Sequence, residues 1–160
     1  MKFELVELVE LSGPFAKIYT VYLYDEEIYL YDQFVEDYKS DFQKEVNSIT
    51  SRLKIMGKKV GALENYFRQY EGNYGDKVCA LLKDEGFKLR MYCIRFDNTC
   101  VILGSGGYKD TDTWQEDEIL SQEATTMIEI SQILHNSIHN ADILISSDGE
   151  ILGELIFDTD

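Results

Sequence analysis

Residues 89–110 read LRMYCIRFDNTCVILGSGGYKD, and this stretch decides the fold. Residues 88–96 and 99–103 are rich in β-branched, aromatic and other apolar residues, which is typical of strands. Only Asp97-Asn98 separates them, and so short a connection permits an antiparallel hairpin but no crossover. Residues 77–83 precede them across the loop 84–87, so we expect a three-strand meander that ends where the glycine-rich segment 104–110 breaks the sheet.

Amino-terminal to the meander, the sequence predicts one strand and two helices. Residues 16–24 (AKIYTVYLY) have strand composition, and residues 28–31 can pair back as a short arm. Residues 32–56 carry an apolar residue every three or four positions, which predicts a helix with Asp32 as its N-cap and Gly57 just past its end. A second, shorter helix is predicted from Gly61 to residue 70.

Carboxy-terminal to the meander, residues 114–138 have helical apolar spacing, and the turn Asp148-Gly149 joins two strand-like segments, 142–146 and 151–157. The whole pattern predicts an α+β fold. An antiparallel sheet, made of the amino-terminal strand and the meander, packs with two amino-terminal helices and one carboxy-terminal helix, followed by an extra β-hairpin. At this length we expect a single domain over 1–160, with 139–160 as a hairpin appendage.

Charge is distributed unevenly along the chain. The formal net charge is −15, yet residues 58–109 carry nine Lys and Arg against six acids. Residues 110–160 carry thirteen acids and no Lys or Arg, and residues 1–57 carry six cations against eleven acids. The sequence therefore predicts a weakly basic centre between acidic flanks, and its overall charge argues against general binding to nucleic acid or anionic membranes.

The strand at 88–96 offers the clearest candidate site. Period-two alternation places Lys88, Arg90 and Tyr92 on one face. On an open sheet face, Arg and Lys can hold a phosphodiester while Tyr stacks on a base or moves a proton. An ordinary solvated sheet face carries the same residue types, and that interpretation remains open.

These residues also carry a family resemblance. An Arg-bearing strand (Leu89 to Tyr92), an apolar strand (Val101 to Leu103) and a Lys-bearing loop (Tyr108-Lys109), followed by a helix, resemble the RelE/ParE superfamily of bacterial toxins. The nearest branch is the HigB-like one with its phage-encoded relatives (Gp49-like). The resemblance covers residues 16–138, which would form a toxin-like core.

The resemblance implies a toxin of a toxin–antitoxin system, acting as a metal-free, ribosome-dependent mRNA endoribonuclease, or an inactive relative of one. In that chemistry the RNA 2′-hydroxyl attacks its own phosphate while cations stabilise the transition state. By the resemblance Arg90, Lys109 and Tyr92 would be catalytic. The substrate-binding residues would be Lys88, Arg68, Arg95 and Tyr108. The implied partners are mRNA on the ribosome and a cognate antitoxin.

The charge supports a different function on the same fold. A non-catalytic acidic module, of the kind that phages and mobile elements use as regulators, would bind a basic protein partner. A third hypothesis joins the two, because the acidic segment 110–160 could fold over the basic meander and mask it. Whether the chain is an enzyme at all therefore stays open at this point.

The remaining motifs predict little chemistry. Residues 104–107 lack the Lys-Ser/Thr of a phosphate-binding loop, and His135 and His139 lack the Glu of a zinc-binding HExxH helix. We therefore expect no metal and no cofactor. Three cysteines without metal-like spacing predict buried, reduced thiols. No segment has the pattern of a signal peptide or membrane span, so we expect a cytoplasmic protein without a membrane partner.

Overall fold

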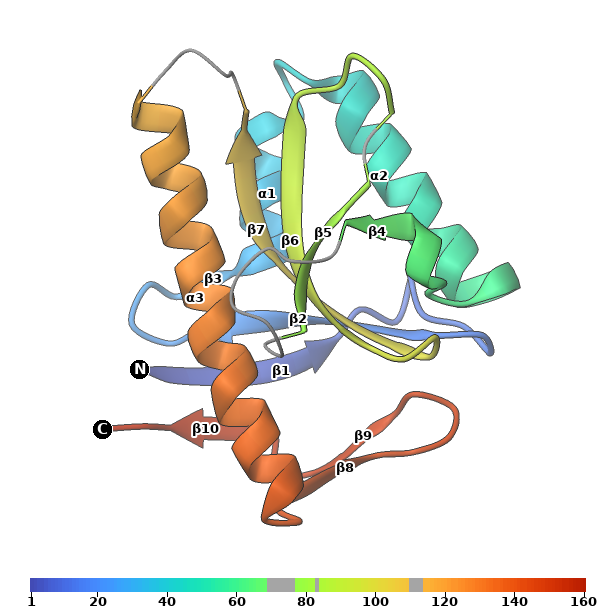
Figure 1. The fold of residues 1–160 in the computed structure, drawn as a ribbon, viewed down its shortest axis with the longest axis vertical. Helices are drawn as coiled ribbons and strands as arrows, with labels where there is room; N and C mark the ends of the chain where they lie inside the picture. The colour runs from blue at the N-terminus through green and yellow to red at the C-terminus, as the bar shows by residue number, and fades with distance from the viewer. Residues whose placement is uncertain (69–76, 83, 110–113) are drawn as a thin grey trace.

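The meander lies at the centre of the molecule in the computed structural model, which describes residues 1–68, 77–82, 84–109 and 114–160 (Figure 1). Strands β5 (Val78–Leu81), β6 (Leu89–Phe96) and β7 (Cys100–Tyr108) pair antiparallel in that order. Strand β2 (Lys17–Leu23) joins β7 in parallel, with Ile18 opposite Val101. The predicted α+β fold and the meander are therefore confirmed.

Further strands extend the sheet on both sides. Strand β1 (Lys2–Glu7) pairs with β2, and β10 (Ile156–Asp158) pairs with the other side of β1, so the order is β10-β1-β2-β7-β6-β5-β4. Strand β3 (Ile28–Tyr29) is the predicted short arm on β2, and β4 (Phe67–Arg68) is the outer strand beyond β5.

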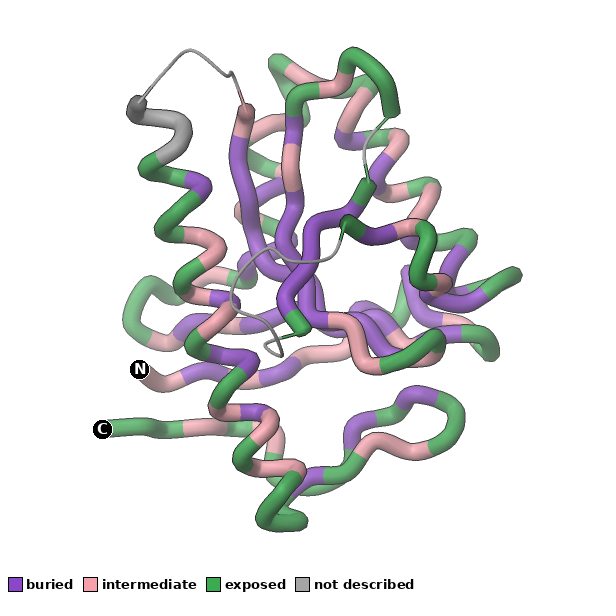
Figure 2. The backbone as a smooth tube through the Cα atoms, viewed as in Figure 1, coloured by how far each residue is buried: buried purple, intermediate pink, exposed green. Residues whose placement is uncertain are grey.

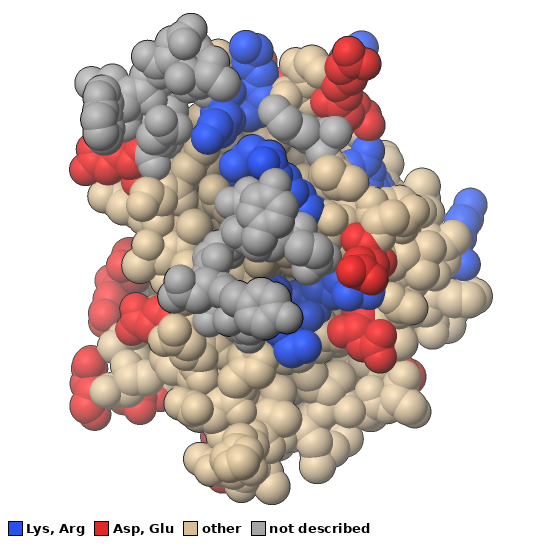
Figure 3. Space-filling model, in the orientation of Figure 1, with Lys and Arg blue, Asp and Glu red and all other residues tan. Residues whose placement is uncertain are grey.

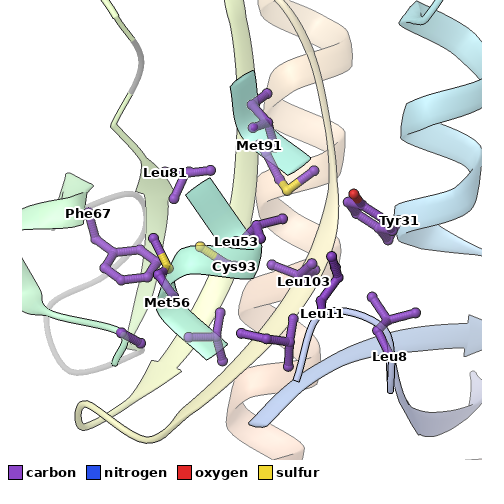
Figure 4. Packing of buried hydrophobic residues seen from close by; sticks show 14 of the residues in the cluster. Leu8, Leu11, Tyr31, Leu53, Met56, Phe67, Leu81, Met91, Cys93 and Leu103 are labelled. Carbon is purple, nitrogen blue, oxygen red and sulfur yellow. The ribbon is translucent and has the colours of Figure 1, made fainter. Parts of the chain in front are cut away.

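Helices cover both faces of the sheet, so the structure has two apolar layers. Helices α1 (Leu30–Tyr38) and α2 (Gln43–Ile55) enclose a cluster with Leu53, Met91 and Leu103, shown in Figure 4. Helix α3 (Trp114–His139) packs on the opposite face, where Met127 and Ile130 meet a second cluster from the strands. Figure 2 shows the buried residues concentrated in the strands between these layers.

The predicted helix over 32–56 is in fact two helices. Helix α1 has Tyr29 as its N-cap and Asp32 in its first turn, and it ends at Tyr38. After α2, a π-helical turn (Met56–Val60) contains Gly57, and Gly61 closes it with φ of 92°. The N-cap and the end that we predicted are therefore wrong, although the apolar stripe does face the sheet.

The predicted second helix from Gly61 is also wrong in its described part. It is a single 3₁₀ turn (Glu64–Tyr66) that leads into β4, where Phe67 pairs with Leu81. The remainder, from residue 69, lies outside the described residues. Aromatic residues at 66 and 67 mimic a helical stripe, yet they have high strand propensity and meet a strand edge that needs a partner.

The glycine-rich segment does not end the sheet as predicted, because β7 continues through it to Tyr108. A Cβ on Gly106 would lie 1.7 Å from the backbone oxygen of Arg90, and a Cβ on Gly104 would lie 2.5 Å from the Met127 sulfur. These glycines permit close approach rather than a turn. The pairing of β6 with β7 shifts register between Met91 and Cys93, which marks a bulge here.

The predicted carboxy-terminal hairpin is confirmed as β8 (Ile143–Ile145) and β9 (Ile151–Gly153). The predicted second strand over 151–157 is wrong in its extent, because β9 ends at Gly153 and the following strand, β10, pairs with β1 instead. The Ile151 amide donates a hydrogen bond to Tyr19 Oη at 2.9 Å, which ties the hairpin to β2. A Cβ on Gly149 would touch the Thr99 carbonyl. The hairpin therefore lies at the Asp97–Thr99 turn of the meander, at the opposite end of β6 from Lys88, so it does not cover that residue.

The three cysteines are buried and unbridged, as the sequence predicts. Cys79 and Cys93 are direct neighbours across β5 and β6, with their sulfur atoms 3.8 Å apart. Burial raises the pKa of Cys100 to about 12. The pKa of Cys93 is also raised, by its contact with Cys79 and then by burial, so both groups stay protonated near neutral pH.

Candidate functional site

An open cleft of about 660 Å³ lies at the end of the sheet where β6 begins and β7 ends. Its lining residues come from both helical layers as well as from the strands, and they are Tyr38, Phe42, Glu45, Gly86, Lys88, Tyr108 and Ile119. We call this feature the aromatic cleft. The connection between α1 and α2 builds one wall, because Tyr38 is the last residue of α1 and Phe42 directly precedes α2.

Aromatic rings line this wall in sequence. The ring centroids are 5.2 Å apart for Phe34 and Tyr38, 6.1 Å for Tyr38 and Phe42, and 5.2 Å for Phe42 and Tyr108. Phe34 is fully buried, whereas the other three rings are partly exposed. The four rings therefore run from the core to the surface. Packing against the buried ring holds the three partly exposed rings in place, and their faces could stack on a planar group.

The two charged residues that line the cleft, Glu45 and Lys88, both make contacts with neighbouring elements. One carboxylate oxygen of Glu45 accepts hydrogen bonds from the backbone amides of Lys88 at 2.6 Å and Leu89 at 2.9 Å. This fixes the start of β6 against α2. The Lys88 ammonium lies 5.9 Å from the centre of the Tyr108 ring, which is within the range of a cation–π contact.

The strand register brings four of the predicted site residues to this end of the sheet. Arg90 is opposite Gly107, and Leu89 is opposite Tyr108. The Lys109 amide donates to the Lys88 carbonyl at 2.8 Å. Three cations, Lys88, Arg90 and Lys109, are therefore crowded within two residue steps of each other. Figure 3 shows Lys and Arg gathered over the middle of the visible face.

The other three predicted residues do not join them. Tyr92 is only 3% exposed and packs in the cluster with Met127 beneath α3, so the expected open sheet face is wrong at this position. Alternation along a strand does not reveal that a distant helix covers the face. Arg68 is exposed on the outer strand β4. It is opposite Ala80 of β5, which in turn is opposite Tyr92 of β6, so Arg68 lies two strands away from Tyr92.

Arg95 lies on the opposite face of the sheet and has a structural role. Its Nε donates to the Ala62 carbonyl at 2.8 Å, and its terminal amine donates to Asn98 Oδ1. Its guanidinium also lies 5.9 Å from the Phe67 ring centre. These contacts hold the end of the meander to the segment before β4, so Arg95 contributes to the fold rather than to the cleft.

Five cleft residues were not among the predicted site residues: Tyr38, Phe42, Glu45, Gly86 and Ile119. In the sequence Tyr38 and Phe42 belong to a helical core stripe, and their aromatic character is the one available signal of another role. Ile119 is 46% exposed, which is unusual for a large apolar residue on a packed helix. No local pattern singles out Glu45.

A second feature is a set of carboxylates on α3 and on the segments near it, in two groups, one around Glu123 and one around the Met1 amino group. Burial raises the pKa of Glu123 on α3, and the nearby Asp37 of α1 raises it further. Near the chain termini the pKa of the Met1 amino group is raised by its hydrogen bond to Asp160, with smaller contributions from Asp25 and Glu129. We call these five carboxylates the acidic edge; Figure 3 shows acidic side chains along this side.

Comparisons with models of known protein families, with curated proteins and with solved structures gave no match. No helix in the part of the chain that the structure describes combines the length and apolar content needed to cross a membrane.

Proposed function

We propose that this protein is a non-catalytic binding module whose acidic edge binds a basic protein partner. The observation that carries the proposal is the acidic charge on the α3 side of the molecule, where burial and the charge of Asp37 raise the pKa of Glu123. Both burial and the neighbouring carboxylate raise the pKa of Glu123, and among the described residues no cation contributes to that shift. An arrangement that costs folding free energy is typical of a functional surface, because a cationic partner would relieve the repulsion.

The distribution of charge supports this proposal. The net charge of −15 gives a long-range field that attracts cationic proteins, and residues 110–160 contribute thirteen acids without a Lys or Arg. Lys2 lies 4.6 Å from the Tyr24 ring, and Lys39 pairs with Glu36, so neither cation is placed against Glu123 by these contacts. Neither of these two contacts involves a carboxylate of the acidic edge, in which Asp160 pairs with the Met1 ammonium at 3.1 Å.

The test is capture of partners from a cell extract, followed by affinity measurement at several salt concentrations. We expect partners of high pI, and we expect affinity to fall steeply between about 50 and 300 mM salt, because screening shortens the range of exposed charges. The double variant Asp37→Asn with Glu123→Gln should bind more weakly. The matched control, Glu64→Gln with Glu85→Gln, makes the same change in net charge away from the acidic edge.

An affinity that does not depend on salt would contradict the proposal. Equal losses in the two double variants would also contradict it, because net charge alone would then explain the binding.

A toxin-like endoribonuclease is the second candidate, and one observation favours it. Lys88, Arg90 and Lys109 crowd together beside the aromatic cleft, where cations could hold a phosphate while Tyr108 stacks on a base. The burial of Tyr92 weighs against it, since a buried phenol cannot reach RNA. In this mechanism Tyr108 would have to take over its role.

The nuclease candidate has its own test. Purified protein should cleave mRNA on ribosomes, and expression should arrest growth, with both effects lost in Arg90→Ala and Lys109→Ala. Intact RNA and normal growth with the wild-type chain would eliminate this candidate and leave the binding module.

A further inference from the structure

Strand β10 is the outermost strand of the sheet next to β1, and its outer side is unpaired among the described residues. The Leu5 amide donates to the Leu155 carbonyl, and the Thr159 amide donates to the Met1 carbonyl, both at 3.0 Å. In an antiparallel pair, alternate residues bond to the neighbouring strand. Residues 155, 157 and 159 therefore face β1, while Ile156 and Asp158 direct their backbone N–H and C=O groups outward.

A groove of about 440 Å³ accompanies this edge, between β10 and the carboxy-terminal half of α3. Its apolar lining includes Ile133 and Ile156, and Ile156 is 42% exposed. Three exposed acids, Asp142, Glu154 and Asp158, also line it, and its described lining residues include no Lys or Arg. The groove therefore combines apolar contact with negative charge.

We propose that the outer edge of β10 takes an extended, cationic segment of the partner as an added strand. This inference rests on the proposed function and specifies which part of the partner is recognised. Backbone hydrogen bonds to Ile156 and Asp158 would supply main-chain pairing, and alternation would place every second side chain of the segment over the groove. Apolar side chains would contact Ile133 and Ile156, while Lys or Arg side chains would meet the acids.

A second copy of this chain fits the edge poorly. Two copies paired through β10 would bring Glu154 and Asp158 of each chain against the same acids of the other, and each copy carries a net charge of −15. Charged residues on an edge strand are a known protection against such self-pairing. The same acids that repel another copy would attract a cationic strand. Charge therefore favours a cationic segment over a second copy at the outer edge of β10.

The probe for this test is an acetylated eight-residue peptide of alternating Lys and Val, titrated into the full-length protein by calorimetry. A matched peptide carries methyl groups on alternate backbone amides, which blocks pairing without changing charge. In the protein, Ile156→Pro removes one outward N–H and leaves the bonds to β1 intact, since proline is tolerated on edge strands. Ile156→Val is its control.

We expect the methylated peptide and the Ile156→Pro protein each to weaken binding by about tenfold or more, because several backbone hydrogen bonds are lost. Ile156→Val should bind like the wild type. Undiminished binding of the methylated peptide overturns the inference, because attraction would then come from charge alone. Absence of any peptide binding also overturns it, and capture of basic partners through the acidic edge would in that case leave the proposed function standing.

Discussion

Replacing Gly106 with alanine should strongly destabilise the fold, because its Cβ would collide with the backbone of β6. A Cβ added at this position would lie 1.7 Å from the Arg90 carbonyl oxygen, 2.7 Å from its carbon and 2.9 Å from the Met91 Cα. Real Cβ contacts do not fall below 3.0 Å, so backbone atoms would have to separate by more than 1 Å. A side-chain neighbour could rotate away, but a paired strand cannot.

The expected cost is about 3 kcal/mol or more, at the upper end of the range for overpacking, because ladder hydrogen bonds break as the strands part. Urea unfolding followed by circular dichroism measures the change in free energy. Gly86→Ala is the matched control: Gly86 has φ of 85° and no atom within 4 Å of its Cβ position. It should cost about 1 kcal/mol, which is the penalty for an alanine in this conformation.

If Gly106→Ala is no more destabilising than Gly86→Ala, the close approach of β6 and β7 is not a constraint and the reasoning fails. If the variant still folds, the displaced β6 backbone should also change the cluster of Lys88, Arg90 and Lys109 at the aromatic cleft. Amide chemical shifts of these residues would detect that change.

Three further predictions concern single groups. Burial and then a neighbouring carboxylate raise the pKa of Glu123 above its ordinary value of 4.5, so the free energy of unfolding of the wild type should fall as the pH rises from 4.5 through the raised pKa. Glu123→Gln should lack this fall and be the more stable protein at pH 7, as urea unfolding at each pH would measure. Tyr19→Phe leaves the buried Ile151 amide without its acceptor and should cost about 1–3 kcal/mol, and an unchanged unfolding midpoint would show that another acceptor replaces it. The oxidant diamide should form a disulfide between Cys79 and Cys93 slowly in the folded protein and faster in urea, as intact mass and peptide mapping would reveal. A disulfide to another cysteine in the folded protein would contradict the 3.8 Å separation of these two sulfur atoms.

Helical periodicity in the sequence locates the apolar surface of residues 32–56 but cannot reveal the corner within it. Tyr38 and Phe42 keep the four-residue spacing across the break between α1 and α2, because both rings pack at the corner. The glycines at 104–107 resemble a turn for a related reason. Their role is to admit Met127 and the Arg90 backbone, and those neighbours are distant in the sequence.

The candidate site is partly predictable. Pairing of the meander places Lys88, Arg90, Tyr108 and Lys109 together, and two-residue alternation with a short turn is enough to foresee this. The burial of Tyr92 cannot be foreseen from the strand, because it depends on where α3 docks. The groove beside β10 likewise requires the pairing of β10 with β1, and no local pattern encodes that pairing.

That pairing also determines when the sheet can be completed during folding. The meander pairs strands that are neighbours in sequence, so it can form early. The pairing of Phe3 with Phe157 and that of Ile18 with Val101 join residues far apart in the sequence, so these pairs form later. On a ribosome the outer side of β1 would stay open until residue 156 has emerged. In a concentrated solution of folding chains the same opening would admit β10 of another molecule, so slow or crowded refolding should produce strand-exchanged dimers.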